Sequence, residues 1–382
     1  MVSPIKRILI TFQALTVISV VSCFAQSSPY IRVAIIQDAV SLSLKINGSY
    51  EIVDSLSQKV LSGGRNLKTT VTSYKYGILI GGMNLSCDKV FIKTKDVESL
   101  IIDGRRFNGD IQFVKKDNSH LLVINYVDLE DYIKGILYHE VSHYWPSEAL
   151  KAQAIVCRTY ALYQMQENRL KDFDVTCDIY SQVYGGKTSE RYRTNKAVDA
   201  TKNEVLNYQG KIFPAYYHAT CAGHTEDASL LWNIDIAPLK GVTCGFCQDS
   251  PHFRWHKVLS LDEIEDTLIK SGCAECKNIK NILILDKDKS GRISNLNILT
   301  DKKDIKIAAK DFRNMLGPNV IRSTNFNVKI INRDAVFEGF GWGHGVGLCQ
   351  WGSYFMAKKG YTYKEILKYY YPGAEVTLIV SR

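Results

Sequence analysis

The spacing of the hydrophobic residues changes near residue 126, and this change limits the chain to an α+β fold. Residues 27–125 read as short strands separated by turn signals, with YIRVAII, GILIGG and HLLVINYV as clear examples. After residue 126, Leu129, Ile133 and Ile136 recur at the three- and four-residue steps of a helix. A second helix is predicted after Pro146, with a buried stripe formed by Leu150, Ala154, Cys157, Ala161 and Met165.

Residues 1–26 have the pattern of an export signal. Lys6 and Arg7 precede the uncharged run ILITFQALTVISVV, which is too short and wrongly flanked for a membrane span. VVSC, ending at Cys23, fits a lipoprotein signal with a lipid anchor, whereas CFAQ allows ordinary cleavage near Ala25. Both remain open, and either places the mature protein in the periplasm or cell envelope.

The charge of the chain suits an anionic partner such as a cell wall. The net charge is +9 and falls by two when Lys6 and Arg7 leave with the signal. Acidic and basic residues are interspersed, and no basic tract indicates nucleic-acid binding.

The string YHEVSHYW contains His139, Glu140 and His143 at the HExxH spacing of zinc metalloproteases. Both histidines must share one continuous helix, yet Pro146 follows His143 by three residues and interrupts helical hydrogen bonding there. Glu167 on the next helix is the candidate for a distant third ligand. A zinc protease therefore remains only a remote alternative.

Glu140 has a second interpretation. It continues the helical face of Leu129, Ile133 and Ile136, so apolar surroundings should raise its pKa and suit it to general acid catalysis. The structural alternative is an ion pair with Lys151 or Arg158.

The motifs from residue 125 to 375 resemble the SpoIID/LytB family. LEDYIKGILYHEVSHYWPSEALKAQAIVCRTYAL is followed in order by SQVYGG, YYHATCAGHTEDA, GRISNLNI and GWGHGVGLCQWGSYFMAKKGYTYKEILKYYYPG. The resemblance implies a SpoIID-like catalytic core and a peptidoglycan lytic transglycosylase, with Glu140 as its catalytic residue. The alternative that it implies is a non-catalytic amidase enhancer or glycan-binding protein, with a cell-wall amidase as partner.

A lytic transglycosylase needs one carboxyl group and no metal for its chemistry. The C6 hydroxyl of the muramic acid attacks the anomeric carbon and leaves a 1,6-anhydro end, so the second carboxylate of ordinary glycosidases is unnecessary. Glycan strands, either intact or stripped of stem peptides, are the expected substrate.

Other residues of the matching motifs are candidates for substrate binding. Arg158 is a candidate to hold a lactyl carboxylate. The glycine-rich loop around Trp342 and His344 suits a close approach of backbone to ligand. Its alternative is a structural turn in which His344 and Gln350 satisfy buried backbone groups. The full predicted set comprises Gln153, Arg158, Gln182, Tyr184, His218, Trp342, His344 and Gln350.

The cysteines allow a structural zinc site. CAGH and CGFC supply Cys221, His224, Cys244 and Cys247, a Cys3His set, with His218, His252 and His256 as rivals for the histidine position. Because the protein is exported, disulfides are the alternative. Cys273 and Cys276 are predicted to form a disulfide or to remain reduced.

The string DKDKSGRISNLN opens like a calcium loop at Asp286. Its twelfth position is Asn297 instead of glutamate and its flanks are strand-like, which favours a hairpin turn. The predicted organisation is a signal at 1–26, a β-rich region at 27–125, a SpoIID-like core at 126–255 and 336–382, and an inserted helix-and-hairpin segment at 256–335.

Overall fold

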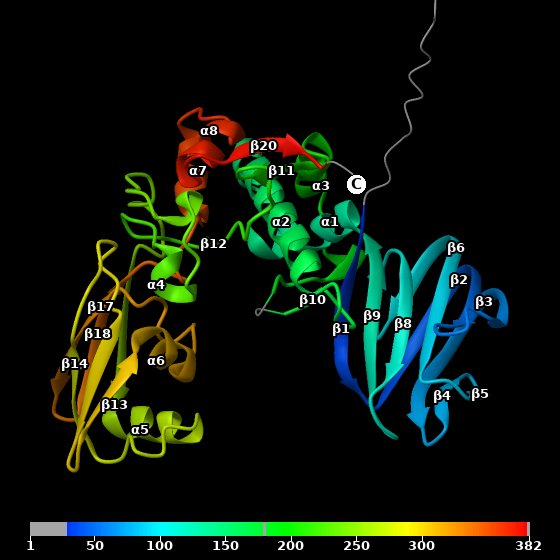
Figure 1. Ribbon diagram of the computed structural model, residues 1–382, viewed down its shortest axis with the longest axis horizontal. Coiled ribbons are helices and arrows are strands. Elements are labelled where there is room, and N and C mark those ends of the chain that lie inside the picture. The colour runs from blue at the N-terminus through cyan, green and yellow to red at the C-terminus, as the bar shows by residue number, and fades with distance from the viewer. Residues whose placement is uncertain (1–28, 179–180, 380–382) are drawn as a thin grey trace, which may run out of the picture.

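A computed structural model describes residues 29–178 and 181–379 (Figure 1). The predicted export signal, with Cys23 and Ala25, lies outside the described residues. Helices and strands are mixed, and strands dominate the N-terminal region, so the predicted α+β class is confirmed. In the described part of the chain, no helix is long and apolar enough to cross a membrane.

The N-terminal region is one large, mostly antiparallel sheet. Its order is β10-β1-β9-β8-β6-β2-β3-β4-β5, and β7 pairs with β6. Alternate side chains such as Leu42, Leu44 and Ile46 point into the core, as expected for strands with one buried face. The strands are β1 (Tyr30–Ala39), β2 (Ser41–Asp54), β3 (Val60–Tyr74), β4 (Gly77–Ile80), β5 (Met83–Leu85), β6 (Lys89–Ile102), β7 (Arg105–Phe107), β8 (Asp110–Lys115), β9 (Leu121–Asp128) and β10 (Val175–Thr176).

Helices α1 (Leu129–Glu140) and α2 (Ser147–Glu167) lie at the centre of the molecule (Figure 1). The predicted stripe from Leu150 to Met165 packs against the core of the N-terminal sheet. A second face of α2, formed by Ala152, Ile155 and Val156, packs against the core of the C-terminal half. The two cores therefore share α2, which makes this helix the structural centre of the fold.

The core around α2 is completed by segments far apart in the sequence. β12 (Tyr217–His218) pairs in parallel with β19 (Leu348–Cys349), and β11 (Glu204–Asn207) pairs antiparallel with β20 (Glu375–Leu378). The remaining elements are the short 3-10 helices η1 (Gly186–Ser189) and η2 (Ala237–Leu239), and the helices α3 (Tyr192–Ala200), α4 (Ala228–Trp232), α7 (Gln350–Lys358) and α8 (Tyr363–Tyr370).

The inserted segment forms a lobe with its own hydrophobic core. β13 and β18 pair along their whole lengths, so the lobe runs from Arg254 to Phe340, a little beyond the predicted 256–335. The calcium-like string at Asp286 is the turn between β14 and β15, as predicted, and Cys273 and Cys276 form a disulfide. The elements of the lobe are β13 (Arg254–Ser260), α5 (Leu261–Lys270), β14 (Ile279–Ile284), β15 (Asn295–Thr300), β16 (Asp304–Ala308), α6 (Ala309–Leu316), β17 (Phe326–Ile331) and β18 (Asp334–Phe340).

Candidate active site

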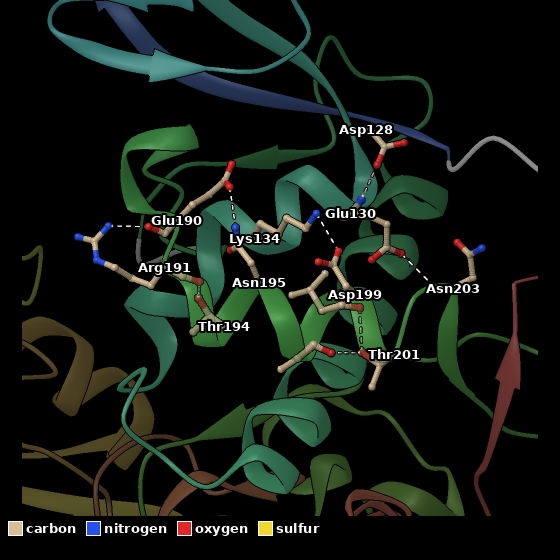
Figure 2. Close-up of polar contacts among 12 residues, drawn as sticks. Asp128, Glu130, Lys134, Glu190, Arg191, Thr194, Asn195, Asp199, Thr201 and Asn203 are labelled. Carbon is tan, nitrogen blue, oxygen red and sulfur yellow. Dashed lines mark hydrogen bonds and ion pairs between the residues drawn. The ribbon is translucent and has the colours of Figure 1, made fainter.

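Helix α1 is held rigidly at its N-terminal end. The Asp128 side chain caps the helix by accepting a hydrogen bond from the Glu130 backbone N–H at 2.8 Å. Figure 2 shows the side chains of Glu130 and Lys134 extending toward α3 and the chain that follows it. Lys134 pairs with Asp199 at 2.9 Å, and Glu130 accepts a hydrogen bond from the Asn203 N–H at 3.2 Å. These contacts anchor the first half of α1, the helix whose last residue is Glu140.

Glu140 is the last residue of α1, and its environment favours the protonated form. The residue is half-buried. Burial raises the pKa of its carboxyl group to about 7, while a hydrogen bond from the Tyr217 hydroxyl acts in the opposite direction. The expected ion pair with Lys151 or Arg158 is absent, since Lys151 pairs with Glu148 and Arg158 with Glu130. Glu140 therefore has the pKa of a group that can donate and accept a proton near neutrality.

A chain of hydrogen bonds leads from the interior to Glu140. The Tyr132 hydroxyl donates to Gln182 Oε1 at 3.1 Å, and Gln182 Nε2 donates to the Tyr217 hydroxyl oxygen at 3.1 Å. The Tyr217 hydroxyl also forms hydrogen bonds with the Glu140 carboxyl group and with Cys157, so it links Gln182 to both. Gln182 thus orients the Tyr217 hydroxyl and is almost fully buried. Tyr217 was not singled out from the sequence, although it lies in the quoted motif YYHATCAGHTEDA.

Gln350 contacts the C-terminal end of α1. Its Nε2 donates to the Glu140 carbonyl oxygen at 3.2 Å and lies 3.5 Å from Gln153 Oε1. Gln153 in turn donates to Cys157 Sγ at 3.3 Å. Both glutamines are buried, so the structure places them as supports of the helix end that carries Glu140.

The glycine-rich loop places His344 beside His218. The two rings lie 5.7 Å apart, and both bond to Val346, whose N–H donates to His344 Nδ1 and whose carbonyl contacts His218 Nδ1. Burial, with Arg313 and Arg292 nearby, lowers the pKa of His344 to about 3. Burial likewise lowers the pKa of His218. Both imidazoles are therefore neutral at physiological pH. Trp342, farther back in the loop, is half-buried, and Arg322 lies over its ring.

An aromatic cluster that the sequence analysis did not identify continues from this loop. The rings of Tyr216 and Trp232 stack 4.3 Å apart at an interplanar angle of 32°. Tyr160 and His344 contact the Tyr216 ring at 5.9 Å each. Burial raises the pKa of the Tyr160 hydroxyl, with a smaller contribution from the charge of Glu140. Trp232 remains 39% exposed, so part of its indole face is accessible.

The histidines of the HExxH string do not lie together on one helix. α1 ends at Glu140, and His143 lies in the turn that follows, as Pro146 predicts. The Nε2 atom of His139 contacts the Ser189 hydroxyl at 2.6 Å. Among the described residues, the group that could hold a metal includes none of these three side chains. The zinc-protease alternative therefore lacks its ligand geometry.

The structure places Arg158 and Tyr184, two more of the predicted substrate-binding residues, in the interior. Arg158 is fully buried, and its guanidinium makes two hydrogen bonds to the Glu130 carboxylate at 2.8 and 2.6 Å, so it does not face the site. Tyr184 is also buried, with its hydroxyl donating to Asn125 Oδ1 at 2.9 Å. The polar groups of both side chains bond within the protein.

The predicted cysteine cluster is present with a different fourth member. The sulfur atoms of Cys221, Cys244 and Cys247 gather around Cys349 Sγ, and all four lie within 4.8 Å of one another. His224 is not part of the group, since its Nδ1 contacts the Thr225 carbonyl oxygen at 2.6 Å. The predicted Cys3His set is thus replaced by four cysteines.

Comparisons with known proteins agree with this architecture. The SpoIID family model, described as stage II sporulation protein, matches residues 117–208, and a domain of unknown function (DUF8618) matches residues 239–347. An uncharacterized protein of Brachyspira hyodysenteriae is 34% identical over 350 residues, which cover 91% of this chain and 92% of that protein.

Two Bacillus subtilis proteins are also similar. The stage II sporulation protein D is 30% identical over 268 residues, covering 66% of this chain and 75% of the relative. The amidase enhancer is 25% identical over 361 residues, covering 80% of this chain and 50% of the relative. The chain thus spans half the length of the amidase enhancer.

Proposed function

Because the chain belongs to the SpoIID/LytB family, we propose that it is a peptidoglycan lytic transglycosylase with Glu140 as its single acid and base. The observation that carries this proposal is the position of Glu140 at the end of a firmly anchored helix, where burial raises the pKa of its carboxyl group to about 7. A carboxyl group with that pKa is protonated in a large fraction of molecules at neutral pH, yet it ionises readily enough to act as a base.

The proposed reaction uses Glu140 twice. Its proton moves to the glycosidic oxygen as the bond from the muramic acid C1 to that oxygen breaks. The C6 hydroxyl of the same sugar forms a new bond to C1 and loses its proton to the Glu140 carboxylate. Glu140 returns to its starting state, and no water is consumed. During the charged stage, the hydrogen bond from Tyr217 stabilises the carboxylate.

The electrostatics of the site support one carboxyl group instead of two. Retaining glycosidases place a second carboxylate about 5 Å from the acid, and its charge would raise the pKa of the acid. Burial is the cause that raises the pKa of Glu140, and no carboxylate in the described part of the chain contributes. An intramolecular nucleophile such as the C6 hydroxyl fits this arrangement.

The pKa of Glu140 predicts an alkaline limit to activity. As a general acid, Glu140 must be protonated when the reaction begins, so the rate should fall as pH rises through about 7. The Tyr217 hydrogen bond stabilises the carboxylate and lowers this pKa, and Tyr217→Phe should therefore move the alkaline limb to higher pH and reduce the maximal rate. The measurement is the pH dependence of kcat/KM for both proteins. A limb that Tyr217→Phe leaves in place would exclude Glu140 as the titrating group.

The accessible face of Trp232, whose ring contacts Tyr216 and His344, is proposed as a platform for a sugar ring of the substrate. Covering about 60 Å² of indole is worth about 1.5 kcal/mol, so Trp232→Ala should raise KM roughly tenfold with little change in kcat. Tyr192→Ala is the control, since Tyr192 is 80% exposed on α3. Equal kinetics for Trp232→Ala and wild type would exclude the platform.

An amidase enhancer is the second candidate, because one relative carries that name. The two functions are separated by incubating purified glycan strands, either intact or stripped of stem peptides by an amidase, with the mature protein alone. If the protein is the enzyme, it should release soluble fragments with anhydro-muramic ends without any partner. In the cell, this reaction would take place outside the cytoplasm. Binding without release, together with faster cleavage by an added amidase, would favour the enhancer. The preferred strand identifies the substrate.

A further inference from the structure

Four cysteine sulfurs meet in the interior of the core. Cys221 follows β12, Cys244 and Cys247 lie in the loop CGFC, and Cys349 ends β19. All four residues are buried and none is in a disulfide, although Cys273 and Cys276 of the same chain form one. Three separate segments of the chain thus bring free thiol groups to one point.

The spacing of the sulfurs fits a shared ion. The four atoms lie within 4.8 Å of one another, and the Cys221 and Cys247 sulfurs are 3.5 Å apart. A tetrahedral zinc ion with Zn–S bonds of about 2.3 Å requires its sulfurs to lie roughly 3.8 Å apart. A disulfide requires only about 2.05 Å between two of them. The compact group of four matches the first arrangement.

The surroundings supply hydrogen-bond donors for thiolates. Cys349 is the N-cap of α7, and its sulfur accepts hydrogen bonds from the Gly352 N–H and the Cys221 N–H, each at 3.3 Å. The Tyr370 hydroxyl lies 3.1 Å from Cys244 Sγ. The positive end of α7 and these donors stabilise negative charge on sulfur, as a tetrathiolate site requires.

We propose that Cys221, Cys244, Cys247 and Cys349 bind one Zn²⁺ as a closed structural site. Four protein ligands leave no open position for water, so the ion takes no part in bond cleavage. The site joins the parallel pair β12 and β19, in which His218 lies opposite Cys349, to the loop that leads into the inserted lobe.

The ion would also support the catalytic residue from a distance. Tyr217, which bonds Glu140, lies four residues before Cys221, and Gln350, which bonds the Glu140 backbone, follows Cys349 directly. An ion bound to Cys221 and Cys349 would fix β12, which contains Tyr217, and β19, which directly precedes Gln350. Gln350 and Tyr217 are therefore positioned by a site that does not touch the substrate.

The test is elemental analysis of the full mature chain by inductively coupled plasma mass spectrometry, combined with thiol labelling of the denatured protein. We expect one zinc and no iron per chain, and thiol reactivity at all four cysteines once the metal is removed. Cobalt(II) added to stripped protein should give the visible bands of a tetrahedral thiolate site. Removal of zinc should lower the thermal midpoint, and zinc readdition should restore it.

Single Cys221→Ser and Cys349→Ser variants should lose most of the zinc, because each removes one ligand. The matched control is Cys273→Ser with Cys276→Ser, which removes the disulfide and should retain full zinc content. Metal-free wild-type protein with two disulfides among the four cysteines would overturn the proposal, and this outcome remains measurable if a variant fails to fold. None of these readouts depends on glycan cleavage, so the zinc site and the proposed activity can fail separately.

Discussion

Replacing Glu140 with glutamine is expected to reduce the release of glycan fragments by about 10²- to 10⁴-fold, the usual contribution of a general acid and base. The amide keeps the shape of the side chain but has no proton to give to the leaving oxygen. Because a neutral amide also suits the buried position, the variant should fold at least as stably as wild type at pH 8. The measurement compares initial rates of soluble fragment release, with the thermal midpoint as a check on folding.

Two variants control for this result. Glu167→Gln changes an exposed glutamate at the end of α2 and should leave the rate unchanged. His143→Ala removes the second histidine of the HExxH string and should also retain activity, since His143 lies in a turn beyond α1. Loss of activity in His143→Ala, together with sensitivity to chelators on protein substrates, would revive the protease alternative. Full activity in Glu140→Gln would remove Glu140 from the mechanism.

Replacing Arg158 with methionine should cause the largest loss of stability. The change leaves the Glu130 carboxylate buried without its partner, which costs about 3–5 kcal/mol in comparable buried pairs. Arg158 also donates to the Glu204 carbonyl oxygen at 2.9 Å, so α2 loses a second contact. The measurement is the free energy of unfolding from urea denaturation.

The matched control for Arg158 is Lys134→Met, which breaks the more exposed pair with Asp199 shown in Figure 2. That change should cost only about 0–1 kcal/mol. Adding Glu130→Gln to Arg158→Met should recover much of the loss, because the unpaired charge is then gone. If Arg158→Met unfolds like wild type but binds glycan poorly, Arg158 contacts the substrate after all.

The sequence was sufficient to predict the two helices around Glu140 and the apolar surroundings of its carboxyl group. The helical spacing from Leu129 to Glu140 predicts a half-buried carboxyl group, and Pro146 predicts the break before α2. Both depend on interactions within one turn of the chain, which local patterns record well. The raised pKa of Glu140 follows from the same burial.

The errors concern contacts between distant segments. Glu130 and Glu140 both belong to α1, and only the packing of α2 against its first turn decides that Arg158 pairs with Glu130. His224 was chosen for the metal site because it is close to Cys221 in sequence. The pairing of β12 with β19 instead brings in Cys349 from across the chain.

The partners of Glu140 were missed for a similar reason, since they lie on other segments of the chain. Tyr217 approaches Glu140 from β12, and the stacking of Tyr216 with Trp232 joins that strand to α4. Neither contact leaves a periodic signal in the sequence, because each joins residues of different elements.

The central claim is that Glu140 assists attack by the sugar's own hydroxyl group and not by water. It is tested most directly by digesting purified glycan strands in water enriched in ¹⁸O and analysing the released fragments by mass spectrometry. The account predicts 1,6-anhydro ends that contain no ¹⁸O, and none of these products with Glu140→Gln. Reducing ends that carry one ¹⁸O atom would show hydrolysis and contradict it.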